Sequence, residues 1–76
     1  MKITYTIGQL ARAAGIPTST VRYYERRGIL RPVSRTAHNY RKYDDRSLSR
    51  LQFIRAAQDT GFSLDDIESL LSLRDG

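Results

Sequence analysis

The stretch from Ile7 to Leu30 constrains the fold more than any other part of the chain, because it predicts two short helices joined by a tight turn. Apolar residues at 7, 10, 11 and 14 fall on one helical face, and Gly15 has the permissive backbone that ends a helix. A second helix is expected from Pro17 and Thr18, where the Thr18 hydroxyl can cap it, and it should close at Gly28. A helix this short is unstable alone, so its inner face must pack on the first.

The rest of the chain is predicted to extend this helix-turn-helix unit. Two β-prone arms within residues 29–43 surround a polar tip that begins at Ser34, which indicates a hairpin, or wing. A third helix is expected after Asp44 or Asp45, and a fourth from residue 63. The alternating residues 2–5 are either a lead-in strand or a loose terminus. The predicted fold class is therefore mainly α with a small β-hairpin, a winged helix-turn-helix with four helices.

The spacing of apolar residues also predicts the core. Phe62, which follows a glycine between the third and fourth helices, is expected to anchor their junction, and Tyr43 to pack between the hairpin and a helix. The other inward-facing side chains are predicted to be Val21 and Tyr24, then Leu48, Leu51 and Ile54, and finally Ile67, Leu70 and Leu71.

The charge of the chain is unevenly distributed. The formal net charge is +5 and the sequence pI is near 10.1. Residues 1–43 hold nine Lys/Arg and a single acid, Glu25, whereas residues 44–76 hold four basic residues and seven acids. This asymmetry indicates a half that faces a polyanion and a half that faces solvent or a partner. The alternative interpretation is a soluble basic protein without a polyanionic ligand.

The outer face of the second helix has side chains suited to DNA. A helix-turn-helix places its second helix in the major groove. Ser19 and Thr20 are small enough for close approach, and their hydroxyls can bond to bases or phosphates. Arg22 and Arg26 can pair with phosphates, Arg22 can also reach a guanine, and Tyr23 can donate to a phosphate oxygen. Two helices around a glycine turn also occur in many unrelated folds.

The predicted hairpin adds a second basic element. Arg35 lies near its tip, Arg41 and Lys42 lie on the return arm, and Tyr40 lies among these cations. Contacts of this kind to phosphates hold the register and supply much of the salt-dependent affinity. Each of these residues has an alternative interpretation. Arg35 can be a solvated loop charge, and Tyr40 can pack between the hairpin and a helix. His38 is either a phosphate contact or a solvent-exposed side chain.

The composition argues against other classes. The chain has no cysteine and one histidine, so a transition-metal site is not expected. Its acids cluster at predicted helix ends, where capping explains them, and no nucleophile has an evident activating partner. There is no glycine-rich phosphate loop. We therefore expect no enzymatic activity and no cofactor. Because no apolar run approaches the roughly 18 residues of a membrane span, we expect a cytoplasmic protein.

Several motifs resemble the MerR family of transcription regulators. Residues 20–30, TVRYYERRGIL, are similar to the recognition helix of that family. Residues 39–44, NYRKYD, resemble the return arm of its wing, and residues 61–64, GFSL, resemble the step between its third and fourth helices. The motifs occur in the family's order and cover residues 1–76 as one domain.

The resemblance implies how such a domain works. It implies recognition contacts from residues 18–23, Thr18 included, and phosphate contacts from Arg22, Tyr23, Arg41 and the wing. Members of the family are dimers joined by a long antiparallel coiled-coil helix. They bind pseudo-palindromic promoter sites and distort that DNA so that RNA polymerase can use it, when an effector binds the C-terminal region.

The chain departs from the family at its end. It stops at Gly76, about where the family's dimerisation helix begins. We therefore expect the dimerisation helix and effector domain to be absent and the fragment to be monomeric. An excisionase-like architectural factor that bends DNA is the alternative, and a domain that binds an acidic protein partner is a third hypothesis.

Overall fold

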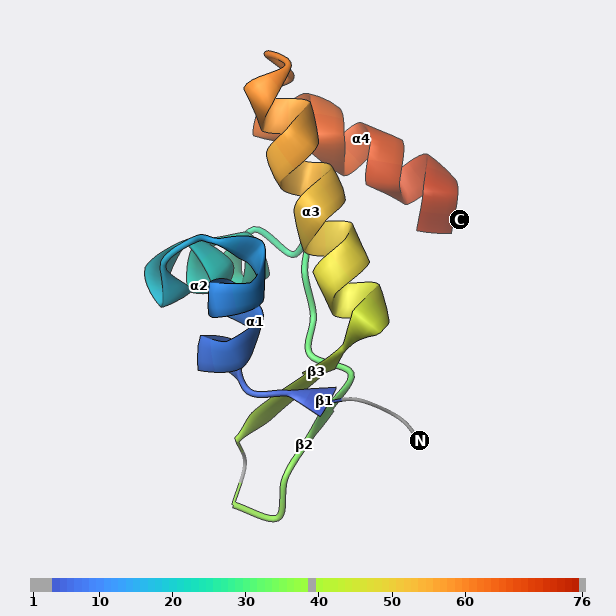
Figure 1. Cartoon of the computed structure of the whole chain (residues 1–76). Helices are drawn as coiled ribbons and strands as arrows, with labels where there is room; N and C mark the ends of the chain where they lie inside the picture. The colour runs from blue at the N-terminus through green and yellow to red at the C-terminus, as the bar shows by residue number, and fades with distance from the viewer. Residues whose placement is uncertain (1–3, 39, 76) are drawn as a thin grey trace.

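The computed structural model describes residues 4–38 and 40–75, and this part of the chain forms four helices and three short strands (Figure 1). Asn39, in the predicted hairpin tip, and residues 2–3 of the predicted lead-in strand lie outside the described residues. The prediction of a mainly α fold with a wing is confirmed. The elements are β1 (Thr4–Tyr5), α1 (Ile7–Ala14), α2 (Thr18–Arg26), β2 (Ser34–Arg35), β3 (Arg41–Asp44), α3 (Asp45–Asp59) and α4 (Leu64–Asp75).

Local hydrogen bonds set both ends of α1. At its start the Thr6 hydroxyl accepts from the Gln9 N–H at 3.2 Å, and the Gln9 side chain accepts from the Thr6 N–H at 2.9 Å, which is a capping box. At its end Gly15 has a φ of 72°. This left-handed conformation lets the Ile16 N–H donate to the Ala11 carbonyl at 3.0 Å, which closes the helix as predicted.

The start of α2 differs from the prediction. Pro17 is the N-cap residue, with extended backbone angles and no side-chain cap, so the prediction that the Thr18 hydroxyl caps this helix is wrong. Thr18 is already the first helical residue, whereas a capping side chain must come from the non-helical residue before it. The end of α2 lies within one residue of the prediction, because Arg27 is the C-cap residue and Gly28 directly follows it. Gly28 has a φ of 77°, and the Ile29 N–H donates to the Tyr24 carbonyl at 3.1 Å.

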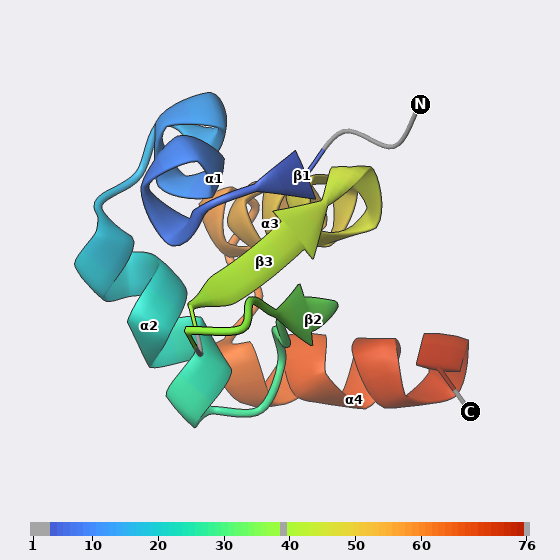
Figure 2. The ribbon, with the colours of Figure 1, turned by 90° about the horizontal axis from the view of Figure 1, so that it is seen from below.

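The three strands form one antiparallel sheet with β3 in the middle, as Figure 2 shows. Tyr5 of β1 pairs with Tyr43, and Arg35 of β2 pairs with Arg41, so the lead-in stretch is a strand and the hairpin is confirmed. The prediction that the polar tip begins at Ser34 is wrong, because Ser34 and Arg35 are paired with β3. The turn begins after them.

The two C-terminal helices also begin at capping residues. The Asp44 carboxylate accepts from the backbone N–H groups of Arg46 and Ser47 at 3.0 and 3.2 Å, at the start of α3. Ser63 and Asp66 exchange side-chain-to-backbone bonds of 3.1 and 3.2 Å at the start of α4. The starts of α3 and α4 match the predicted boundaries, because each capping residue lies next to the helix that it caps in the sequence. None of the described helices is long and apolar enough to cross a membrane.

The core lies between the helix-turn-helix unit, α3 and the sheet, and it departs from prediction at two residues. The predicted residues Val21, Tyr24, Tyr43, Leu51, Ile54, Ile67 and Leu71 are buried. Leu48 is half-buried and packs against this core, as predicted, whereas Leu70 is 40% exposed and Phe62 is 47% exposed. Since α4 crosses one end of α3 (Figure 1), only the narrow stripe through Ile67 and Leu71 is covered, and Leu70 lies beside it. The backbone fixes the junction at Phe62, whose N–H donates to the Ala57 carbonyl at 3.0 Å.

Candidate nucleic-acid interface

The rotation of α2 is fixed by two buried side chains on its inner face. Val21 is fully buried and Tyr24 is 2% exposed, and the Tyr24 hydroxyl donates to the Gln58 side chain of α3 at 2.5 Å. With this face held against the core, the opposite face of the helix must point to solvent. The helix is therefore presented in one orientation.

The outward face of α2 brings together most of the predicted contact residues. Ser19, Arg22, Tyr23 and Arg26 are all exposed, and their spacing places them on one helical face. The Arg26 guanidinium lies over the Tyr23 ring, 5.9 Å from its centroid, which is a cation–π arrangement. Thr18 and Thr20, the other two predicted residues of this helix, are half-buried.

The wing supplies a second exposed group. Arg35, His38 and Tyr40 are exposed, and Tyr40 as a residue is 72% accessible. Arg41 and Lys42 are half-buried on β3, opposite Arg35 and Ser34 respectively. The structure thus places all five predicted wing residues at or near the surface. It does not bury Tyr40 in the packing role that was the alternative for that residue.

A single acid connects α2 to the wing. The hydroxyl of the buried Tyr43 donates to Glu25 Oε1 at 2.8 Å, and Arg41 Nε lies 3.2 Å from Glu25 Oε2. Burial, which has the larger effect, and the hydrogen bond to Glu25 together raise the pKa of the Tyr43 hydroxyl above its ordinary value. The Arg41–Glu25 contact is an ion pair whose geometry is not that of a hydrogen bond. Glu25, the only acid among residues 1–43, therefore holds the wing against α2, a role that we did not predict from the sequence.

Arg27, the C-cap residue of α2, connects the end of that helix to α4, a role that we did not predict from the sequence. Arg27 Nη2 donates to Asp65 Oδ1 at 2.8 Å, Nε donates to Glu68 Oε1 at 3.1 Å, and Nη1 donates to the Tyr23 hydroxyl at 3.3 Å. The contacts to Tyr23 and Glu68 raise the pKa of the Arg27 guanidinium. Because Asp65 and Glu68 lie 38 and 41 residues away in sequence, no local pattern could have predicted these pairs.

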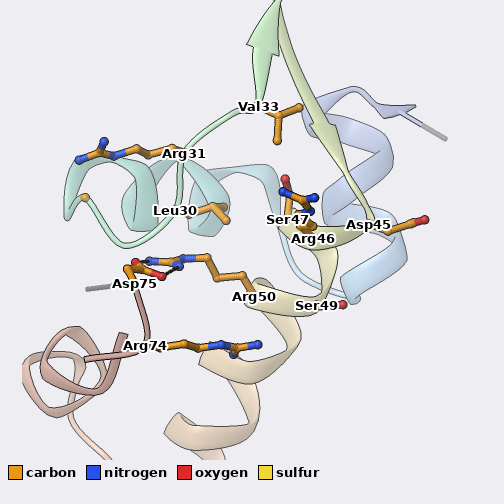
Figure 3. Close-up of a pocket in the computed structure, with 11 residues that line it drawn as sticks. Leu30, Arg31, Val33, Asp45, Arg46, Ser47, Ser49, Arg50, Arg74 and Asp75 are labelled. Carbon is orange, nitrogen blue, oxygen red and sulfur yellow. Dashed lines mark hydrogen bonds and ion pairs between the residues drawn. The ribbon is translucent and has the colours of Figure 1, made fainter. Parts of the chain in front are cut away.

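A different arginine arrangement lies around the hollow shown in Figure 3. An open hollow of about 780 Å³ lies between the segment after α2, the start of α3 and the end of α4. Arg50 donates to the Ile29 carbonyl at 2.6 Å and forms a two-point ion pair with Asp75 at 3.0 and 2.9 Å, which joins α3 to the end of α4. This pair lowers the pKa of the Asp75 carboxyl. None of the residues that line the hollow is a predicted DNA contact. Across residues 4–38 and 40–75, no group of three His, Asp or Glu side chains could hold a metal ion.

An exposed basic face on the second helix of a helix-turn-helix, beside a basic hairpin, defines a winged helix-turn-helix DNA-binding domain. A family model described as the MerR HTH family regulatory protein matches residues 5–73. The chain belongs to the MerR family, and it is a DNA-binding domain of that family. The predicted family and function class are confirmed, and the family consists of transcription regulators, not enzymes.

Relatives and solved structures agree with this assignment. The mercuric resistance operon regulatory protein of Shigella flexneri is 44% identical over 71 residues, which are 93% of this chain and 49% of the relative. The heavy metal-dependent transcription regulator 1 of Rhizobium meliloti is 46% identical over 68 residues, 88% of this chain and 46% of the relative. The chain thus spans about half the length of the curated relatives it matches.

The structural match is equally broad. HiNmlR, a MerR family regulator that lacks the sensor domain and was crystallised with promoter DNA, superposes with a TM-score of 0.88 at 32% identity. That match covers 95% of this chain and 55% of HiNmlR. The lead(II) complex of PbrR691 from Ralstonia metallidurans has a TM-score of 0.86 at 42% identity, over 93% of this chain and 56% of PbrR691.

Proposed function

We propose that this chain is the part of a transcription regulator that binds promoter DNA, with α2 in the major groove and the wing against the flanking backbone. The observation that carries the proposal is the exposed face of Ser19, Arg22, Tyr23 and Arg26, held in one orientation by the buried side of α2. The similarity to HiNmlR, which is bound to promoter DNA in its crystal structure, supports this choice of ligand.

The proposal gives the α2 residues two kinds of role. Thr18, Ser19 and Thr20 lie in the first turn of the helix, where small hydroxyl side chains can meet base edges or phosphates. Arg22, one turn further along, can reach a guanine or a phosphate. Tyr23 donates to a phosphate oxygen, and Arg26 pairs with a phosphate while it covers the Tyr23 ring.

The wing residues supply contacts that carry little sequence information. Arg35, His38, Tyr40 and Lys42 contact the backbone beside the groove. Arg41 holds the wing to Glu25 through Nε. The Arg41 side chain is 37% accessible, and its exposed part can still face a phosphate. Such contacts fix the position of α2 on the duplex.

The proposal extends to the regulated promoter. Two copies of the domain bind the halves of a pseudo-palindromic site and distort the DNA between them, so that RNA polymerase can use the promoter. Bending or untwisting a site costs roughly 1–6 kcal/mol, which the helix and wing contacts of two domains can offset. Since the ligand is promoter DNA, a cytoplasmic location belongs to the same proposal.

Quantitative DNA binding tests the groove assignment. A duplex is first selected by the chain from a random-sequence pool, and affinity is then measured by fluorescence anisotropy at several salt concentrations. Arg22→Ala should weaken binding by roughly 1–3 kcal/mol and leave the circular dichroism spectrum unchanged. Arg46→Ala is the matched control, because Arg46 is an exposed arginine that lines the hollow of Figure 3 and is not a proposed DNA contact. If Arg22→Ala binds like this control, α2 does not lie in the groove as proposed.

The same titration tests the backbone role of the wing. Arg41→Ala should weaken binding to selected and unselected duplexes alike, and the salt slope should fall by about one. An unchanged slope would show that Arg41 acts only within the protein, through Glu25.

A further inference from the structure

Arg27, the C-cap residue that follows α2, differs from the basic residues of that helix because its guanidinium faces acidic side chains of α4. Two of its nitrogens bond to carboxylates, Nη2 to Asp65 at 2.8 Å and Nε to Glu68 at 3.1 Å. A direct phosphate contact by Arg27 would break these pairs and leave two carboxylates unpaired beside the DNA. Arg27 is therefore not suited to contact DNA itself.

The third contact of Arg27 is the one that touches the proposed interface. Nη1 donates to the Tyr23 hydroxyl at 3.3 Å. A phenol oxygen that accepts a hydrogen bond still has its own O–H to donate, and a cationic neighbour makes that O–H a better donor. Arg26 lies over the face of the same ring. The two arginines thus hold the Tyr23 ring and hydroxyl in one place at the exposed surface.

We propose that Arg27 is a positioning residue, which is anchored on the Asp65 and Glu68 carboxylates of α4 and fixes the Tyr23 hydroxyl for donation to a DNA phosphate. The proposal rests on the proposed function, since it requires α2 to lie against DNA. It also makes the position of α4 relevant to DNA affinity. A displacement of α4 would move the anchor of Arg27 and with it the Tyr23 hydroxyl.

A double-mutant cycle on the 76-residue chain and its selected duplex tests the link. Tyr23→Phe should weaken binding about tenfold, the order expected for a hydrogen bond to a charged group. Arg27→Met should weaken binding about fivefold in the parent chain and less than about twofold in the Tyr23→Phe background, because its effect passes through that hydroxyl. The salt slope should not fall by one with Arg27→Met, as it would if Arg27 contacted a phosphate. Arg27→Lys keeps the charge but not the planar fork, and should rescue only part of the loss.

The outcomes separate the inference from the function on which it rests. A chain that binds no duplex refutes the proposed function. Tyr23→Phe with parental affinity overturns the inference, while Arg22 still tests the groove. An equal loss from Arg27→Met in both backgrounds also overturns the inference, since Arg27 then acts independently of Tyr23.

The anchor itself provides a second test, which also serves if Arg27→Met does not fold. The double variant Asp65→Asn/Glu68→Gln removes two negative charges from a DNA-binding domain, a change that by simple electrostatics should strengthen binding. If the carboxylates hold Arg27 in place, binding should instead weaken about threefold, within the range expected for a partly exposed, charge-assisted network. Asp59→Asn is the matched control, because Asp59 is an exposed acid that does not contact Arg27. Stronger binding by the double variant, as by the control, would overturn the proposal.

Discussion

Replacing Glu25 by alanine tests whether one side chain holds the wing to α2. The Glu25 side chain is only 12% exposed, and both of its oxygens face the wing. The first accepts a hydrogen bond of 2.8 Å from the fully buried Tyr43, and the second lies 3.2 Å from Arg41 Nε. The substitution removes the shared partner of Tyr43 and Arg41 and leaves the Tyr43 hydroxyl buried without that acceptor.

The expected loss follows from these two contacts. A hydrogen bond to a charged group contributes about 1.5–3 kcal/mol, and leaving its buried donor unpaired costs a similar amount. The ion pair adds at most about 1 kcal/mol, because Arg41 is 37% exposed and partly screened by solvent. Glu25→Ala should therefore destabilise the domain by about 3 kcal/mol, a large share of the roughly 4–11 kcal/mol expected for 76 residues. For a domain of this size the melting temperature should fall by about 10–25 °C.

Thermal and urea unfolding, followed by circular dichroism, measure this loss. Tyr43→Phe should cost less, about 1 kcal/mol, because it removes the donor along with the need for an acceptor. Glu25→Gln should fall between the two, since its amide can still accept from Tyr43 but cannot pair with Arg41. A melting temperature for Glu25→Ala within about 3 °C of the parent, with an unchanged urea m-value, would show that the wing is held by other contacts.

Three further outcomes are expected. Val21→Asp should prevent folding, because it places an unpaired charge at a fully buried position; a native-like circular dichroism spectrum would show that α2 is turned the other way. The raised pKa of Tyr43 means that the unfolded chain loses this proton first, so stability should be complete below the ordinary pKa of 10.0 and decline as pH rises above it. Tyr43→Phe should flatten that decline, and identical alkaline unfolding curves for the two proteins would contradict this. The lowered pKa of Asp75 acts in the opposite direction: its contribution to stability is present above the ordinary pKa of 3.8 and is lost at lower pH. Asp75→Asn should therefore make stability, measured by urea titration, less sensitive to acid. An unchanged pH profile would argue against the pair with Arg50.

The helix boundaries were predictable because their signals are local. Gly15 and Gly28 end α1 and α2 with positive φ angles, and side chains at Asp44 and Ser63 cap the next two helices. Each of these devices involves residues within a few positions of one another. Thr18 was misassigned as a cap because the N-cap residue and the first helical residue are adjacent and differ only in their backbone angles, which the sequence does not fix.

The core was predictable wherever a side chain lies in the middle of a helical face. Val21, Ile54 and Ile67 are buried as the periodicity indicated. Leu70 is exposed because the angle at which α4 crosses α3 decides how wide a stripe of α4 is covered. That angle is a property of two packed surfaces, and no single helix sequence contains it.

By itself, the sequence determined the helix-turn-helix, the wing, the basic side chains on both and the resemblance to the MerR family. These depend on residue types at short spacings, which a reader of the chain can see directly. Only the tertiary structure decided which charges remain available to DNA. Glu25 engages Arg41, and Asp65 and Glu68 engage Arg27, across separations of 16, 38 and 41 residues. An arginine has the same charge in every sequence, but whether it faces a phosphate or a carboxylate depends on what the fold places within about 4 Å of it.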